Sequence, residues 1–219
     1  MDWTEAIDGY CERLAPGLWA EPVNLVTNAA FVIAGLVMWH RCAGAPTGRL
    51  LSAVLVLIGI GSALFHALAN AWSSLADVLP ILAFIVIYIH VAHRDFVGLR
   101  GIAALAASVA AVLALVPLSW LIGRVVPGAG ANAAYGAVAL LILGYGQVLW
   151  AVVPATGRRL VGGALLLMVS IAFRSLDMAV CTNWPVGTHF IWHLLNALML
   201  GWMIEVWRLH RLEAGGAGR

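Results

Sequence analysis

The heptapeptide GTHFIWH, residues 187–193, opens the last long apolar stretch of the chain. His189 and His193 are four residues apart, so on a helix both rings leave the same face, one turn apart. Such a pair can occupy two positions in the coordination shell of a metal ion. The alternative is two membrane-helix histidines that hydrogen-bond to neighbouring helices. A third histidine at the same depth would favour the metal site.

The composition of the whole chain is that of an integral membrane protein. Of its 219 residues, 63% are hydrophobic and only 10% are charged, and the mean hydropathy is +0.97. A soluble domain carries about 25% charged residues. The basic residues are all arginine and are scattered, and the chain has no nucleic-acid-binding motif. We therefore expect no nucleic-acid partner.

Seven membrane-spanning helices are predicted from the apolar runs, since each span needs roughly 20 apolar residues. Their approximate ranges are 21–39, 50–68, 76–93, 102–122, 133–153, 160–180 and 188–209. Residues 1–20 are predicted to lie at the membrane interface, because Trp and Tyr favour the headgroup layer. Residues 21–210 form the predicted transmembrane domain, and 211–219 form a flexible tail. The predicted fold class is an all-α membrane protein.

The arginines predict how this bundle is oriented. Nine fall on the side of the C-terminus: Arg41, Arg49, Arg94, Arg100, Arg158, Arg159, Arg208, Arg211 and Arg219. Only Arg13, Arg124 and Arg174 fall on the other side. Because cytoplasmic loops carry the excess of Lys and Arg, the N-terminus is predicted outside and the C-terminus in the cytoplasm. In a bacterium this is the inner membrane, with the outer end facing the periplasm. Four further histidines lie toward the cytoplasmic ends and are interpreted as interfacial: His40, His90, His93 and His210.

A third histidine is predicted at the depth of the first two. His66 lies in the last turn of the second predicted helix, which runs outward, and His189 and His193 begin the seventh, which runs inward. Asp77, in the first turn of the third predicted helix, lies at the same depth. Ionisable groups inside a bilayer are costly unless they are paired or bind a metal, so they mark function. Three histidines leave one tetrahedral position open, as in a catalytic zinc site that activates water.

Ser62 and Asp77 are the candidate catalytic residues beside this zinc site. Ser62 lies one turn before His66, so its hydroxyl can donate to a developing oxyanion. Asp77 can orient the water, accept its proton and pass that proton to the leaving group. The alternatives are a serine that bonds to its own helix backbone and an aspartate that caps its helix.

Two other groups of polar residues lie inside the predicted spans. The first helix carries a polar stripe at spacings of three and four: Glu21, Asn24, Thr27 and Asn28. This stripe is expected to face protein or water, and hydrogen bonding between helices explains it without catalysis. Arg174 and Asp177 are three residues apart on the sixth helix and are predicted to pair with each other.

The order and spacing of six short motifs resemble one family. The motifs are Tyr10-Cys11-Glu12, Glu21-x2-Asn24-x3-Asn28, Ser62-x3-His66, Asp77-x2-Pro80, Asp177-x3-Cys181 and His189-x3-His193. In this respect the chain resembles the alkaline ceramidases, and more widely the superfamily that includes the adiponectin/progestin receptors and GPI-lipid remodelling proteins. The resemblance implies a seven-helix zinc amidase that acts on ceramide-like lipids. It implies that His66, His189 and His193 bind zinc, and that Ser62 and Asp77 are catalytic. The compact loops resemble those of a bacterial member, for which another N-acylated lipid is an alternative substrate.

The resemblance also raises the question of calcium. Eukaryotic members bind calcium through an N-terminal acidic run and the glutamate that opens the first helix. Here Glu12 and Glu21 match those positions and are the candidate calcium ligands. Arg13 and Leu14 stand in the same run, and they suit poorly a cation that needs several oxygen ligands.

Cys11 and Cys181 both fall on the outer side by the arginine count, where disulfides persist. A bridge between them is predicted, which would attach the N-terminal segment to the end of the sixth helix.

Three functions are weighed for this chain. The first is a zinc-dependent hydrolase that cleaves a lipid amide to a fatty acid and a long-chain amine, with a membrane lipid as its substrate and no obligate protein partner. The second is a seven-helix receptor that senses a lipid or another ligand. The third is a transporter, which would place its ionisable residues near the bilayer midplane rather than toward one face.

Overall fold

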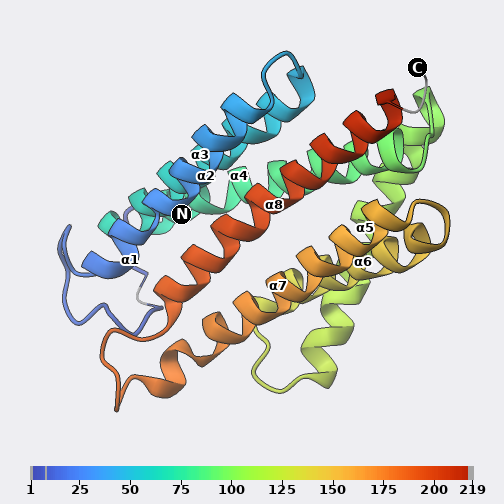
Figure 1. The fold of residues 1–219 in the computed structure, drawn as a ribbon. Helices are drawn as coiled ribbons and strands as arrows, with labels where there is room; N and C mark the ends of the chain where they lie inside the picture. The colour runs from blue at the N-terminus through green and yellow to red at the C-terminus, as the bar shows by residue number, and fades with distance from the viewer. Residues whose placement is uncertain (1, 8, 217–219) are drawn as a thin grey trace.

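The computed structural model describes residues 2–7 and 9–216. Their helices are α1 Pro22–Thr27, α2 Ala29–Arg41, α3 Pro46–Leu68, α4 Ala71–Val91, the π-helix η1 Ala92–Phe96, α5 Gly101–Val125, α6 Asn132–Val152, α7 Pro154–Val180 and α8 His189–Gly216. With α1–α2 and α4–η1 each taken as one span, seven helices are long and apolar enough to cross a membrane. The predicted all-α, seven-helix membrane fold is confirmed (Figure 1).

Helix α8 occupies the middle of the bundle and contacts α2, α3 and α7 (Figure 1). Helices α3 and α8 are the most buried of the seven spans. Both contribute large apolar side chains that are at most 2% exposed to one core cluster, including Leu51 and Leu55 on α3 and Met203 and Ile204 on α8. The two helices that carry the three candidate metal ligands therefore lie in the buried core of the molecule.

Three spans begin earlier than predicted, and local signals explain why. Pro46 and Pro154 stand in the first turns of α3 and α7, where proline is favoured because no backbone donor is lost. Helix α4 begins at Ala71, because Asn70 and Ser73 form a capping box. Asp77 consequently lies in the second turn of α4, so its placement in the first turn and the interpretation of Asp77 as a helix cap were wrong.

The last helix runs further than predicted. Helix α8 continues through Gly216 rather than ending near 209, so the segment 211–216 of the predicted tail is helical. An ion pair of 2.8 Å between Arg159 on α7 and Glu213 on α8 supports this extension. Residues 217–219 of the predicted tail lie outside the described residues.

Hydrogen bonds and a disulfide attach the N-terminal segment to the bundle. The backbone N–H of Ile7 donates to the carbonyl of Ala69 at 2.8 Å, in the turn between α3 and α4. A disulfide joins Cys11 to Cys181, which follows α7. The predicted bridge is confirmed, and it brings the N-terminal segment over the C-terminal ends of α3 and α7 and the start of α8.

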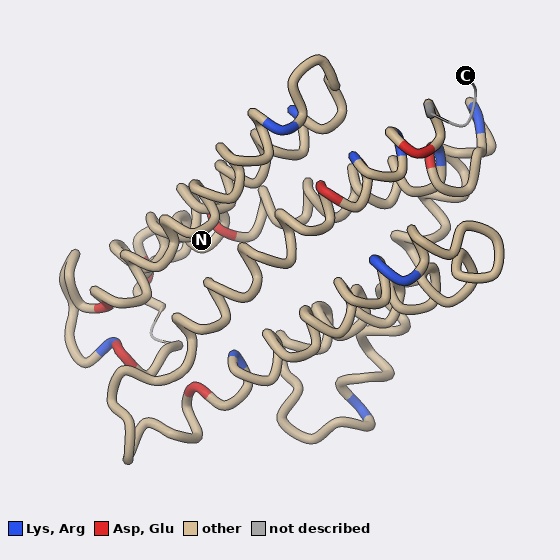
Figure 2. The backbone as a smooth tube through the Cα atoms, in the orientation of Figure 1, with Lys and Arg blue, Asp and Glu red and all other residues tan. Residues whose placement is uncertain are grey.

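Each end of the bundle has a distinct set of side chains. One end, here the histidine end, carries His66, His189 and His193. The other, the arginine end, carries most of the arginines (Figure 2). Arg41 and Arg208 lie together at this end. This segregation agrees with the arginine count made from the sequence. Which end faces the cytoplasm remains a prediction.

One histidine of the arginine end does not fit its predicted interfacial role. His93 in η1 is only 4% exposed. Its ring nitrogens hydrogen-bond to the hydroxyl of Tyr145 on α6 and, at 3.2 Å, to that of Ser108 on α5. The π-helical turn directs the ring between these helices, whereas His40 is exposed as predicted.

Candidate metal centre and active site

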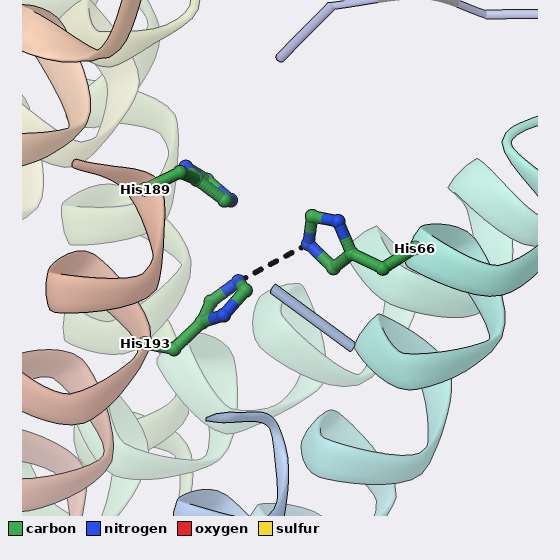
Figure 3. Close-up of side chains that lie close together, drawn as sticks. All are labelled: His66, His189 and His193. Carbon is green, nitrogen blue, oxygen red and sulfur yellow. Dashed lines mark hydrogen bonds between the residues drawn. The ribbon is translucent and has the colours of Figure 1, made fainter. Parts of the chain in front are cut away.

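Three histidines converge at the histidine end of α3 and α8. His66 lies in the last turn of α3, His189 is the first residue of α8, and His193 follows one turn later. Their rings point toward one another (Figure 3), and one nitrogen from each lies within 4.8 Å of the others. The Nε2 atoms of His66 and His193 are 3.1 Å apart. All three side chains are buried, with exposures of 1–2%.

This group fits a metal ion. Two imidazole nitrogens bound to one tetrahedral zinc ion at about 2.0–2.1 Å would lie roughly 3.3 Å apart, close to the observed Nε2 separation of His66 and His193. The Nδ1 atom of His189 is buried without a hydrogen-bond partner among the described residues. A buried polar atom without a partner is costly, so the triad is poorly explained as three structural histidines. The triple-histidine group could hold a metal ion.

In two of these rings, the Nδ1 atom forms a hydrogen bond with a residue at the start of the first span. The carboxylate of Glu21 lies 2.6 Å from Nδ1 of His66. Thr27 donates its hydroxyl to the carbonyl of Val23 at 2.7 Å, so its oxygen is free to accept from Nδ1 of His193 at 2.9 Å. With Nδ1 protonated in each ring, Nε2 carries the lone pair that a metal needs. Histidine ligands commonly use such outer hydrogen bonds to fix their tautomer.

The charge of Glu21 is part of this arrangement. Burial opposes ionisation, but the hydrogen bond and charge of His66, together with donation from Arg13 and Asn24, outweigh it and lower the pKa of Glu21. Among the described residues, the stripe that begins at Glu21 is buried, and Asn24 and Asn28 are at most 1% exposed. The prediction that this stripe faces protein is confirmed, and the break between α1 and α2 lies within it.

Glu12 and Glu21 do not fit a calcium site. Both oxygens of Glu12 accept backbone N–H groups at the start of α1, from Val23 at 2.7 Å and Asn24 at 2.8 Å. Glu21 is bound by the guanidinium of Arg13 at 2.5 Å. A cation adjacent to Arg13 would meet like charge and few free oxygen ligands. These carboxylates anchor the N-terminal segment and orient His66.

Ser62 and Asp77 lie beside a close contact between α3 and α4, at which Gly61 packs against the backbone of Ala76. A Cβ atom on Gly61 would overlap the backbone carbonyl of Ala76, so only glycine permits this approach. The Ser62 hydroxyl and the His66 ring lie near the Asp77 carboxylate. Oδ1 of Asp77 is buried without a hydrogen-bond donor among the described residues, which is costly in a purely structural role.

An apolar cavity of about 640 Å³ opens beside these residues. Asp77, Tyr10 and Arg174 lie at its polar end, and side chains of α4, α5 and α6 line the rest. Tyr10 stacks on His189 with 3.8 Å between ring centroids. Burial raises the pKa of Tyr10 to about 12, so its hydroxyl is un-ionised at neutral pH. Arg174 is directed toward Asn132 and toward the Tyr10 hydroxyl.

The sequence model of a protein family described as Ceramidase matches residues 9–216, nearly the whole chain. The chain belongs to the ceramidase family. No curated protein matches it. Membership indicates a membrane hydrolase with a lipid substrate and amidohydrolase chemistry, so the resemblance drawn from the six motifs is confirmed.

Asp177 has a role in this member of the family that the sequence did not predict. Its carboxylate accepts three backbone N–H groups, from Cys11 at 3.0 Å, Thr188 at 2.8 Å and His189 at 2.9 Å. The predicted pair of Arg174 with Asp177 was wrong, because the positive end of α8 attracts this carboxylate. Asp177 thereby fixes the start of α8, and with it His189, against the disulfide-bonded N-terminal segment. Backbone donors leave no signal in the sequence, so this role could not have been found there.

Proposed function

We propose that this chain is a zinc-dependent membrane hydrolase that cleaves the amide bond of ceramide or a related N-acylated lipid. Its products are a fatty acid and a long-chain amine. The observation that carries the proposal is the group of three buried histidine nitrogens within 4.8 Å, next to an apolar cavity that is lined by Asp77 and by Tyr10, which stacks on His189. The arginine count supports a bacterial inner-membrane location with this site toward the periplasmic leaflet.

His66, His189 and His193 would hold the zinc ion, with Glu21 and Thr27 orienting two of the rings. When bound, zinc in a site with three protein ligands activates water near neutral pH and polarises a carbonyl group. The outer hydrogen bonds place the proton of each of those two rings on Nδ1 and leave the lone pair of Nε2 directed at the ion.

We assign the proton transfers of the reaction to Asp77 and the stabilisation of the developing negative charge to Ser62. Asp77 accepts a proton from the attacking water, and water oxygen forms the new bond to the amide carbon. The Ser62 hydroxyl donates a hydrogen bond to the carbonyl oxygen as negative charge develops there. Asp77 then returns the proton to the amide nitrogen as the C–N bond breaks, so acid and amine leave.

The cavity supports a lipid substrate rather than a peptide or a sugar. A lipid amide links the head group to the acyl chain, so it lies at the depth of the histidine end, with its tail in the bilayer. Asp77 and Arg174 are the charged side chains that line the cavity, and most of the others are apolar. An acyl chain can therefore lie among the side chains of α4, α5 and α6, while the amide reaches Asp77. Apolar walls also exclude water from the reacting carbonyl.

The test is hydrolysis of N-acyl sphingoid lipids by the purified chain in liposomes, with fatty acid and amine measured by mass spectrometry. Turnover should cease with a chelator and return with zinc. Asp77→Asn should keep its zinc yet lose roughly 10²–10⁴ in rate, the usual share of a general acid–base group. Ser62→Ala should lose no more than about 10²–10³, as for one oxyanion donor.

Glu213→Gln is the matched control, because Glu213 is an exposed acid at the arginine end. It should retain wild-type turnover. The catalytic assignment fails if Asp77→Asn retains wild-type turnover. If zinc-loaded protein cleaves no lipid across a broad panel of N-acyl lipids, the receptor hypothesis is favoured.

A further inference from the structure

A second cavity, of about 730 Å³, lies at the arginine end, remote from the histidines. It is bounded by the C-terminal end of α2 and the turn that follows, by η1 and the segment after it, and by the last turns of α8. Five arginines line it: Arg41, Arg94, Arg100, Arg208 and Arg211. Asp95 is the single acidic residue among the lining side chains. We call this the arginine cavity.

The arginine cavity holds more positive charge than its own acidic residues neutralise. Glu205 does not line the cavity itself, but it forms ion pairs of 2.7 Å with both Arg41 and Arg208. Asp95 binds Arg94, also at 2.7 Å. Five guanidinium groups against two carboxylates therefore leave an excess of three positive charges. A cleft lined by one sign of charge concentrates ions of the other sign.

Two of the five arginines are available to a ligand. Among residues 2–7 and 9–216, neither Arg100 nor Arg211 forms an ion pair, and both are exposed. Guanidinium groups match phosphate oxygens with two parallel hydrogen bonds. The rule that places arginines on the cytoplasmic side requires them only in the loops and helix ends. It does not require five of them to meet around one cavity.

An apolar groove of about 510 Å³ continues from the arginine cavity, with Thr47 and Arg94 lining both. The groove lies along α4 and α5, and its walls include Leu105, Val109 and Leu113, each at least 50% exposed. In a membrane these side chains face the acyl region. A ligand that fills both spaces needs an anionic phosphate group joined to an apolar chain.

We propose that the arginine cavity binds the phosphate group of an anionic phospholipid and that the adjoining groove holds one of its acyl chains. Basic pockets between membrane helices on the cytoplasmic side are a recurrent form of lipid headgroup site. Charge selects an anionic headgroup over a zwitterionic one, because a choline group would meet the excess of positive charge. A free phosphate would use the cavity alone and gain nothing from the groove.

The test is direct lipid binding by the full chain, delipidated in detergent and measured by native mass spectrometry. Phosphatidylglycerol and phosphatidylcholine with identical acyl chains are the probes. Wild-type protein should bind phosphatidylglycerol at least about tenfold more tightly. The double variant Arg100→Gln, Arg211→Gln should lose most of this preference, since each arginine near an anionic headgroup changes affinity by about fivefold. Neither substitution leaves an acidic side chain without its ion-pair partner, so the variant should fold normally.

Arg158→Gln is the matched control, because Arg158 is exposed on the same side but does not line the cavity. It should bind phosphatidylglycerol as wild type does. Val109→Trp, which fills the groove, should weaken phosphatidylglycerol binding while leaving all five arginines in place. Binding is measured rather than turnover, because Val86 and Val112 line both this groove and the cavity at the histidine end.

Three results would overturn the proposal. Equal affinity for the two lipids would show that charge does not select the ligand. Unchanged binding in the Arg100, Arg211 double variant would place the lipid elsewhere. Displacement of phosphatidylglycerol by inorganic phosphate at millimolar concentration, with no effect of Val109→Trp, would identify a free phosphate as the ligand.

Discussion

Glu21→Gln should weaken zinc binding without removing any of the three histidine ligands. Glu21 accepts from Nδ1 of His66 at 2.6 Å inside a region where both side chains are at most 2% exposed. Glutamine has the same shape but no charge, so it holds the ring less firmly and leaves Nε2 less basic. Loss of such an outer partner typically costs 10–100-fold in metal affinity, or about 1.4–2.7 kcal/mol.

The same substitution also leaves Arg13 without its carboxylate partner. Arg13 is 7% exposed, and its Nε lies 2.5 Å from Glu21. An unpaired buried charge lowers the free energy of unfolding by about 3–5 kcal/mol, so the single variant will be less stable. The double variant Arg13→Met, Glu21→Gln removes both charges. It should recover most of the stability and keep the weakened zinc affinity.

The assay is zinc titration of metal-free protein against a competing chelator of known affinity, with thermal unfolding measured on the same samples. Glu205→Gln is the control, because Glu205 binds two arginines at the opposite end of α8. A dissociation constant for Glu21→Gln within about twofold of wild type would refute the reasoning. Full recovery of zinc affinity in the double variant would show that Arg13, not the hydrogen bond to His66, caused the loss.

Gly61→Ala should force α4 away from α3 at Ala76, cost about 1–3 kcal/mol of unfolding free energy and lower turnover. Thermal unfolding and lipid hydrolysis measure the two effects. The double variant Cys11→Ser, Cys181→Ser should lose about 2–4 kcal/mol, because the bridge closes a loop of 170 residues, and denaturant unfolding measures this loss. Asp177→Asn should cost about 1.5–3 kcal/mol by weakening the hydrogen bonds at the start of α8, and proteolysis of the loop before α8 should become faster.

Each of these three predictions has a control. Gly144→Ala places its new Cβ in open space on α6 and should be neutral or stabilising. Wild-type protein treated with reductant should match the Cys11, Cys181 double variant, and equal stability with and without reductant would contradict the disulfide prediction. For Asp177→Asn, unchanged proteolysis would mean that the three N–H donors find other acceptors.

The sequence determined the membrane fold and the three histidines of the candidate site. Hydropathy identifies each span from its own residues, because every helix must match the apolar core of the bilayer by itself. The direction of each helix then follows from simple alternation, which placed His66 at the depth of His189 and His193 without any tertiary information. The same alternation placed Cys11 and Cys181 on one side and so predicted their bridge.

The tertiary structure alone decided which side chains serve these groups. Glu21 is 45 residues from His66, and Thr27 is 166 residues from His193, so no local spacing relates them. The ring of His93 is buried, and Asp177 binds backbone donors rather than Arg174. Both outcomes depend on the rotation of each helix about its axis, which is set by the packing of the whole bundle rather than by any one segment. The arginines of three separate elements met around one cavity for the same reason. The depth of a residue in the membrane follows from its own segment, whereas the side chains that it contacts depend on how all the segments pack together.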